Sequence, residues 1–400
     1  MPHYLFARPK PTFLCRKTSE SSLTIPSDEQ PREAKAVAYR RPSYEVGLGT
    51  KGSFMGGSKK DVTQASKDLC RTLLNTKQIT PEDSLFRDDL FEKTCEKIHN
   101  GNEPMVIRDI SLLIVPSAQT LATYGAANLD HLVESVNEGW NSAIAVFGPR
   151  PQPDYSVGFG RSAFTNGQLK KLTPFVGEVT DIFTSYFMAT FRMYFPFLTC
   201  EVKCDAGNLE VADRQNAHSM TLAVRAVVEL YRYVKREKEL HGEILAFSIS
   251  HDDENVRIYG HYALINGTET TFYRHPVHEF AFMALDGRDK WTAYTFVRNI
   301  YDKHMPILHE RICSAINDLP NLDFEVSQQS ELNFPEDPQL QPPQAPGGQF
   351  RTPSNAESMS LGEEDSFVGS SVTTPQTSMT QEVQPPFKKP KNARGGKQQR

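Results

Sequence analysis

Two short motifs carry residue types that could do chemistry on a phosphate ester. Pro153-Asp154 stands at the start of one predicted strand, and Glu201-Val202-Lys203 lies inside another. Side chains alternate along a strand, so Glu201 and Lys203 share one face. Glu and Lys are almost never buried unless they are paired, and a charged pair at the end of an otherwise apolar strand is therefore unusual. The two motifs mark a candidate site.

The chemistry depends on whether the two strands are neighbours. If they are, Asp154 and Glu201 bring two carboxylates together, and the backbone carbonyl of Val202 adds another oxygen. Oxygen ligands of this kind suit Mg²⁺, with Mn²⁺ as an alternative. The metal would activate water and stabilise charge on a phosphate, while Lys203 would orient the water or neutralise the phosphate. This set suits hydrolysis of a phosphodiester and predicts DNA or RNA as the partner.

Hydrophobic periodicity predicts the elements that must position these residues. Helices are expected at 61–75, 81–99, about 129–141, 211–240, 291–304 and 306–317, with a helical insertion at 168–193. Strands are expected at 143–147, 155–159, 196–204, 244–250, 256–264 and around 270–274. The mix indicates an α/β domain, in which helices pack on a central sheet.

The order of these elements around the two motifs resembles the core of the PD-(D/E)XK, or restriction-endonuclease-like, nuclease superfamily. Two segments are also similar to an uncharacterised family of fungal proteins placed near that superfamily, namely GPRPQPDYSVGF at 148–159 and EVK with the later RQNAHS at 201–219. The resemblance covers residues 90–320 approximately. It implies a mixed central sheet flanked by helices, metal-binding acids at Asp154 and Glu201, and a catalytic lysine at Lys203.

Two further residues follow from the resemblance as supporting members of the site. Many superfamily members add an acid from the helix before the first motif. Glu134 and Glu138 both lie on that predicted helix, and the spacing to Asp154 favours Glu134. Several members carry a glutamine early in the helix after the second motif, which corresponds to Gln215. A solvated surface residue explains each of these three positions about equally well.

Charge and composition divide the chain into three parts. The hydrophobic share of 38% is low for a wholly folded chain of 400 residues. Residues 1–60, with eleven Lys and Arg against five acids, are predicted to be a disordered basic arm. Residues 61–326 are predicted to form one nuclease-like domain, with its core at about 128–320, and residues 327–400 a disordered tail.

The tail ends in a segment that contains bases and no acid. Lys388, Lys389, Lys391 and Arg394 lie in it, and they suit nuclear import or loose contact with nucleic acid. A tail that serves solubility alone is the alternative interpretation.

Several function classes are excluded or disfavoured. No stretch reaches the ~18 consecutive apolar residues of a membrane span, which excludes an integral membrane protein. The six cysteines are spread out with no CxxC pair, as is typical of a reducing compartment. The N-terminus lacks the apolar run of a signal peptide. We therefore expect a nuclear or cytoplasmic protein, with the nucleus favoured, that is not secreted; the sequence indicates no oligomeric state.

The leading hypothesis is a Mg²⁺-dependent nuclease, or a nuclease-derived domain that acts on nucleic acid. The alternative is a catalytically inactive nuclease-like module that recruits nucleic acid or protein partners. The acidic middle of the chain favours this alternative slightly, because a broad grip on phosphates needs positive potential. In a third hypothesis the motifs are accidental. If the carboxylates of Asp154 and Glu201 are too far apart to share an ion, or if Lys203 points away, both nuclease hypotheses fail.

Overall fold

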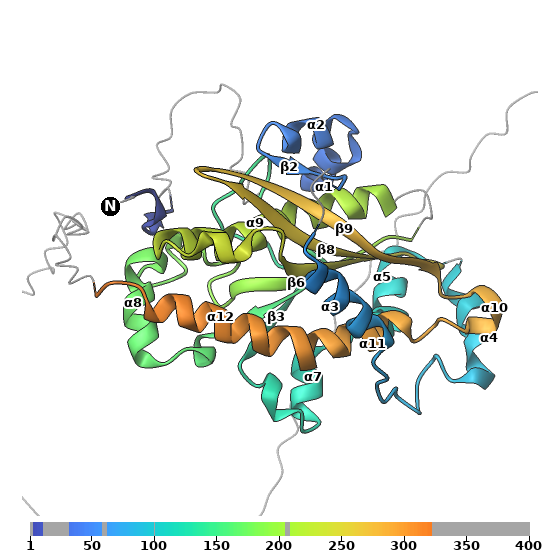
Figure 1. The fold of residues 1–400 in the computed structure, drawn as a ribbon. Coiled ribbons are helices and arrows are strands. Elements are labelled where there is room, and N and C mark those ends of the chain that lie inside the picture. Colours follow the sequence, from blue (N-terminus) through green and yellow to red (C-terminus); the bar gives the residue numbers. More distant parts are fainter. Residues whose placement is uncertain (1–2, 11–31, 58–61, 100, 205–208, 322–400) are drawn as a thin grey trace, which may run out of the picture. The chain divides into compact units, whose positions relative to one another are not determined.

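A seven-stranded mixed sheet forms the centre of the protein (Figure 1), with the strand order β2-β9-β8-β7-β6-β4-β3. The computed structural model describes residues 3–10, 32–57, 62–99, 101–204 and 209–321, all within the first of two units of the chain, Met1–Ser327. The strands of the sheet are β2 (Ser53–Phe54), β3 (Leu132–Val136), β4 (Tyr155–Phe159), β6 (Tyr194–Val202), β7 (Ile244–His251), β8 (Asn255–Asn266) and β9 (Glu269–Ala281). The prediction of an α/β fold is confirmed.

One helix connects the only two long strands that run parallel among the described residues. β4 is antiparallel to both β3 and β6, whereas β7 is parallel to β6. Parallel neighbours need a long crossover, which is usually a helix, and here it is α9 (Leu209–Tyr233). Asn216 of α9 accepts a hydrogen bond from Thr199 Oγ1 at 2.6 Å and donates to the Ile249 carbonyl at 2.9 Å, which fixes α9 on both strands.

Helices cover both faces of the sheet. In Figure 1, α9 lies above the sheet and α12 below it. The lower face is held by aromatic packing, for example Phe247 of β7 edge-to-face on Phe296 of α11, with ring centroids 5.4 Å apart. Besides α9, the α-helices described outside the N-terminal segment are α3 (Gln64–Asn75), α4 (Asp88–His99), α5 (Glu103–Val106), α6 (Leu112–Ile114), α7 (Ala118–Thr123), α8 (Asn166–Val176), α10 (Ala284–Gly287), α11 (Thr292–Asn299) and α12 (Met305–Asn317).

The prediction that residues 1–60 form a disordered arm is wrong for residues 32–57. This segment contains α1 (Arg32–Arg40), α2 (Ser43–Gly49) and β2, and it packs on α9. The phenol oxygens of Tyr39 and Tyr44 lie 2.9 Å and 3.1 Å from Nδ1 of His218, which is fully buried. Two tyrosines on successive helices, α1 and α2, therefore converge on one buried histidine and order a stretch that composition alone assigned to disorder.

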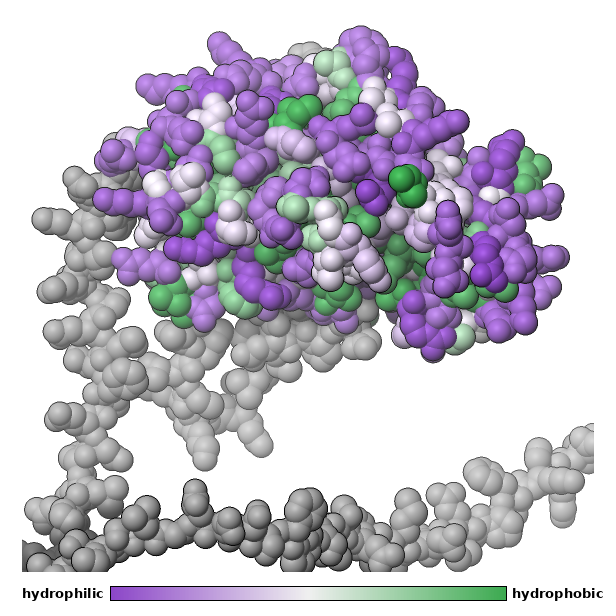
Figure 2. Space-filling view, turned by 90° about the horizontal axis from the view of Figure 1, so that it is seen from below, coloured by the Kyte–Doolittle hydropathy of each residue, from purple (hydrophilic) through white to green (hydrophobic). Residues whose placement is uncertain are grey.

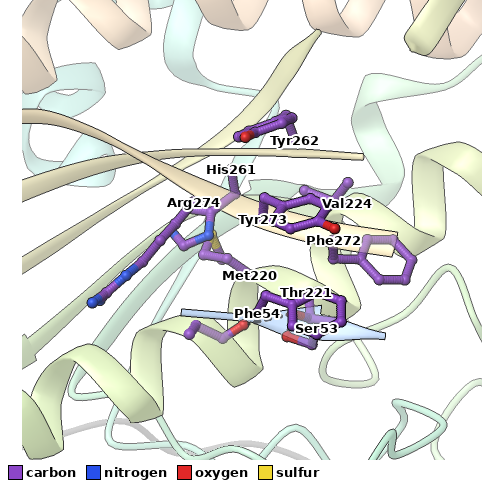
Figure 3. Close-up of a pocket in the computed structure, with 11 residues that line it drawn as sticks. Ser53, Phe54, Met220, Thr221, Val224, His261, Tyr262, Phe272, Tyr273 and Arg274 are labelled. Carbon is purple, nitrogen blue, oxygen red and sulfur yellow. Dashed lines mark hydrogen bonds between the residues drawn. The ribbon is translucent and has the colours of Figure 1, made fainter. Parts of the chain in front are cut away.

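Figure 3 shows the other end of this attachment, where β2 meets α9 and β9. Ser53 Oγ lies 2.7 Å from Thr221 Oγ1, and the ring of Phe54 stacks on that of Tyr273 with centroids 5.2 Å apart. The cavity between them measures about 10 Å³, room for about one water. This cavity is too small for a substrate, and it belongs to the packing of β2.

Two predicted helices differ from the structure for identifiable reasons. The helix expected at about 129–141 is replaced by β3, because Leu132–Val136 pairs residue by residue with β4; tertiary pairing outweighs the helical spacing of the apolar residues. The helical insertion expected at 168–193 is helical only as far as Val176, because Gly177 (φ 83°) ends α8. The short strand β5 (Phe183–Thr184) follows and pairs with β1 (Arg8–Pro9).

Three other boundaries shift. The strand expected at 143–147 is a loop with one bridge, between Ala143 and Ser185. The helix expected from residue 81 begins at Asp88, and the helix expected at 211–240 ends at Tyr233. After the first motif the predicted order of a strand, the strand with the second motif, a long helix and further strands is kept, whereas before it the predicted helix and strand are replaced by β3 and a loop.

Gly158 allows β4 to approach β6 closely. A Cβ added there would lie 2.6 Å from Met193 Cγ and 2.8 Å from the Tyr194 carbonyl oxygen. We expect Gly158→Ala to lower the free energy of unfolding by about 1–3 kcal/mol, because backbone cannot move aside cheaply. Urea titration measures this, with Gly56→Ala as the control, since a Cβ there meets nothing within 4 Å. Equal stability of the two variants would contradict this account.

Three fully buried histidines make stability depend on pH. Burial lowers the pKa of His218 and His261 to about 3 and that of His304 to about 4. The unfolded chain binds protons near ~pH 6.5, so acid favours it and the free energy of unfolding falls as the pH drops below that value.

We therefore expect the urea midpoint to decrease from about pH 7 to about pH 4, and to decrease less in His261→Gln. Glutamine can keep the hydrogen bond to Ser248 Oγ, which lies 2.8 Å from His261 Nε2. His278→Gln, at an exposed position, is the control. A pH dependence that is identical in the two variants would show that burial of His261 does not contribute.

Candidate functional site

The strands that carry the two motifs are neighbours. β4 pairs with β6 in antiparallel register, with Tyr155 opposite Cys200. Asp154 comes directly before β4, so it lies beside the end of β6, and its Oδ2 accepts a hydrogen bond from the backbone N–H of Val202 at 2.8 Å. The condition on which the predicted chemistry depends is met.

The ammonium of Lys203 lies between the predicted metal ligands. Its Nζ donates to the Val202 carbonyl oxygen at 2.5 Å and lies 3.8 Å from Asp154 Oδ2 and 3.9 Å from Glu201 Oε2. All four predicted groups therefore converge on one point. Lys203 points toward both carboxylates, and one cation, the ammonium, already contacts both of them.

A third carboxylate, which the sequence analysis missed, completes the cluster. Glu103 Oε2 lies 3.7 Å from Lys203 Nζ. Glu103 is the first residue of α5, whose N-cap Asn102 accepts a hydrogen bond from the Met105 N–H at 3.2 Å. The sequence Asn-Glu-Pro does signal a helix start. Nothing local, however, shows that this helix begins next to the end of β6.

The cluster is buried and carries more negative than positive charge. Glu201 is 1% exposed, Asp154 3% and Lys203 9%. Buried charges persist only where partners compensate them, and here one ammonium faces three carboxylates. Together with the Val202 carbonyl the carboxylates form a set of hard oxygen donors, the type that Mg²⁺ and Mn²⁺ bind. The residues therefore fit a divalent cation in both donor chemistry and charge.

Neutral groups surround the cluster. The backbone N–H of Lys203 donates to the His251 carbonyl at 2.9 Å, and Nε2 of that histidine lies 3.1 Å from Ser111 Oγ. Burial lowers the pKa of His251, which keeps the ring uncharged at neutral pH. Burial, followed by the charges of Asp154 and Glu201, raises the pKa of the Cys200 thiol. The low-dielectric surroundings therefore strengthen every interaction inside the cluster.

Glu134 binds residues outside this cluster. The prediction that it lies on a helix is wrong. It sits on β3, where its carboxylate accepts hydrogen bonds from Ser117 Oγ at 2.7 Å, Tyr155 Oη at 2.7 Å and the Gln119 N–H at 3.3 Å. These bonds fix the start of α7 to the sheet. Glu138, its neighbour in the prediction, lies 3.9 Å from Arg192 in an ion pair. Both glutamates have structural partners.

Gln215 is buried on α9, so the interpretation as a surface residue is wrong. Its Oε1 has no hydrogen-bond partner among the described residues. The next residue, Asn216, binds Thr199 and also donates to Ser250 Oγ at 3.0 Å. In the pairing of the parallel strands Ser250 stands opposite Glu201. The start of α9 therefore lies next to the strand that carries Glu201. Asn216, and not the predicted Gln215, makes the hydrogen bonds to the strands there.

A second group of possible metal ligands lies at the turn between β7 and β8. One ligand atom from each of His99, Asp253 and Glu254 falls within 4.8 Å of the others. Burial raises the pKa of Asp253, which opposes the charged form that binds cations. Asp252 shapes the turn itself, because its side chain accepts hydrogen bonds from the N–H groups of Glu254 and Asn255 at 2.8 Å and 2.6 Å.

Some expectations concern residues beyond the described ones. Lys388, Lys389, Lys391 and Arg394 lie outside the residues that the structure describes. Within the part that it does describe, no helix combines the length and the apolar character that crossing a membrane requires.

Comparison with known proteins gives one match. No curated protein and no solved structure matches the chain. Residues 90–316, more than half of the chain, match the family described as Domain of unknown function (DUF7924). The matched range contains the whole cluster of Glu103, Asp154, Glu201 and Lys203 and excludes α1, α2, β2 and α3. The chain belongs to the DUF7924 family.

Proposed function

We propose that the protein is a divalent-metal-dependent nuclease, which hydrolyses phosphodiester bonds in DNA or RNA. The observation that carries the proposal is the position of Lys203 Nζ, within 4 Å of carboxylates from three separate segments and of a backbone carbonyl. Acids and a lysine that converge inside a sheet are costly to bury. A role in binding a cation and a phosphate would explain why these residues are buried despite the free-energy cost.

The order of the elements supports a restriction-endonuclease-like core as part of this proposal. β3, β4 and β6 form an antiparallel unit, α9 crosses over, and β7 returns parallel to β6. The first motif precedes the middle strand of this unit and the second ends β6. In open sheets, ligand sites lie beyond the carboxyl ends of parallel strands, and β6 and β7 end at the cluster.

Each residue has a distinct task in the proposed reaction. Asp154, Glu201, Glu103 and the Val202 carbonyl would hold Mg²⁺ or Mn²⁺, which would supply an activated water and stabilise charge on the phosphate. The N–H of Val202 fixes the Asp154 carboxylate before any ion binds. Lys203 would release the Val202 carbonyl and pair with the attacking water or a phosphate oxygen. We also place the protein in the nucleus, where its basic C-terminal segment would attract nucleic acid.

One observation favours a second candidate, a module that binds nucleic acid or protein partners without cleavage. The carboxylates of Asp154 and Glu201 are nearly inaccessible, and Lys203 already satisfies the carbonyl that a metal would need. In this candidate the cluster is an ion network that stabilises the fold.

We expect the purified full chain to cleave single- or double-stranded DNA or RNA in the presence of Mg²⁺ or Mn²⁺. Asp154→Asn, Glu201→Gln and Lys203→Met should each reduce the rate by about 10²–10⁴, because each removes a charge that acts on the metal or phosphate. Gel assays with labelled oligonucleotides measure this, and Glu138→Gln is the matched control. Cleavage that persists in all three variants would contradict the assignment of these residues to the active site. Binding of nucleic acid without cleavage would favour the second candidate.

We expect Glu103→Gln to weaken Mn²⁺ binding about tenfold or more, because it removes one of three carboxylates that face the ion. Lys203→Met should strengthen binding, since the competing ammonium is gone. Isothermal titration calorimetry measures both affinities, with circular dichroism to check that each variant folds. Glu134→Gln is the control, as its carboxylate holds α7 instead. Equal affinity in all variants would contradict a metal site at this cluster.

A further inference from the structure

Two tyrosines of the N-terminal segment share one buried ring nitrogen. The phenol oxygens of Tyr39 on α1 and Tyr44 on α2 lie 2.9 Å and 3.1 Å from Nδ1 of His218, and all three side chains are buried. In Figure 1, α1 and α2 lie at the top of the protein, on the side of the sheet that α9 covers. A ring nitrogen carries at most one proton, so the hydrogen bonds of the two phenols depend on where that proton lies.

The proton of His218 is best assigned to Nδ1. Burial lowers the pKa of His218 to about 3, so the ring is neutral at physiological pH and carries one N–H. Its Nε2 is buried and has no hydrogen-bond partner among the described residues. Buried N–H groups without an acceptor are rarer in proteins than buried acceptors without a donor. We therefore assign the N–H to Nδ1, which donates to the phenol oxygens.

This assignment leaves each phenol with its own proton to donate. Tyr44 Oη donates to the carbonyl oxygen of Phe147 at 3.3 Å. Tyr39 Oη has no such acceptor in the part of the chain that the structure describes. The O–H of Tyr39 is therefore the donor that remains available at this place.

The side chain of Glu201 extends toward the same part of α9. Thr199 precedes Glu201 by two residues on the same face of β6, and it donates to Asn216 of α9 at 2.6 Å. The electrostatic effects agree with this placement. Burial, then Tyr44 and then the charge of Glu201 raise the pKa of the Tyr39 phenol, whereas burial raises that of Tyr44 without a contribution from Glu201.

Arg214 fixes α1 and α2 on the start of α9. Its Nη1 donates to the carbonyl oxygen of Tyr39 at 3.3 Å, and its Nε donates to Glu45 Oε1 at 2.8 Å. The guanidinium is buried, and it thus holds the backbone of α1 while His218 holds the phenol of Tyr39. A residue that its neighbours lock in this way can orient another group precisely.

The surroundings of Tyr39 differ from the opposite face of the domain. Figure 2 shows that face from below as largely hydrophilic, with small and separate hydrophobic areas. Side chains there interact in water, whereas Tyr39 and Glu201 are both almost completely buried. An O–H dipole acts more strongly on a carboxylate in such a low-dielectric place than it would at the surface.

We propose that Tyr39 is a positioning residue of the site, whose O–H attracts the Glu201 carboxylate and keeps it directed toward the bound cation. This inference rests on the proposed function. In the structure Lys203 Nζ lies 3.9 Å from Glu201 Oε2 and restrains it. When Lys203 turns toward the phosphate, Tyr39 is the donor that continues to restrain the carboxylate. Tyr39 lies outside residues 90–316, so a segment beyond the range that matches the family contributes to the site.

Tyr39→Phe and Tyr44→Phe are a matched pair, because each removes one phenol oxygen from the same histidine. In the full chain, we expect Tyr39→Phe to weaken Mn²⁺ binding about tenfold and to lower kcat for nucleic acid cleavage about tenfold, with KM nearly unchanged. Tyr44→Phe should change each quantity by less than about twofold. Isothermal titration calorimetry and gel assays measure these effects, and urea titration compares the stability of the two variants.

The outcomes separate this inference from the proposed function. If the unaltered chain binds Mn²⁺ and both variants keep its affinity, or both lose affinity equally, Tyr39 has only a structural role and the inference alone is overturned. If the unaltered chain binds Mn²⁺ without cleavage, the affinities still decide. If it neither binds Mn²⁺ nor cleaves nucleic acid, the proposed function fails and the inference fails with it.

Discussion

The ammonium of Lys203 compensates three carboxylates, two of which are almost completely buried, and the centre of the domain depends on this interaction. The acids come from the start of α5, the start of β4 and the end of β6. Without a positive charge between them, the mutual repulsion of these groups would oppose the pairing of β4 with β6. The same contacts that would serve chemistry therefore also hold the elements together.

Exposure increases in one direction across the cluster. The side chain of Glu201 is 1% exposed, that of Asp154 2%, that of Lys203 11% and that of Glu103 28%. A phosphate would reach Glu103 and Lys203 before the deeper acids. The nuclease proposal therefore requires a movement of the lysine away from the Val202 carbonyl, while the non-cleaving candidate requires the lysine to stay. The two candidates differ in the motion of one side chain more than in the fold.

The sequence indicated the parts of the site that depend on local geometry. Alternation along a strand placed Glu201 and Lys203 on one face, and the structure brings Asp154 beside them. It could not indicate Glu103, whose approach to Lys203 joins residues far apart in the chain. It also led to a helix around Glu134, because Leu132 and Val133 satisfy a helical pattern until pairing with β4 is available. Similarly, the order of residues 32–57 arises from contacts with α9, which composition does not reveal.

The N-terminal elements lie outside the matched range of the family, yet they are joined to its interior. Arg214 of α9 donates to Glu45 at 2.8 Å, and Asn299 of α11 donates to the carbonyls of Leu73 and Thr76 at 2.8 Å and 2.7 Å. These partners satisfy polar groups that the matched range alone would leave buried and unpaired. The stretch that matches the family is consequently shorter than the stretch that packs together, and a truncation to residues 90–316 would expose interior polar groups that the full chain keeps paired.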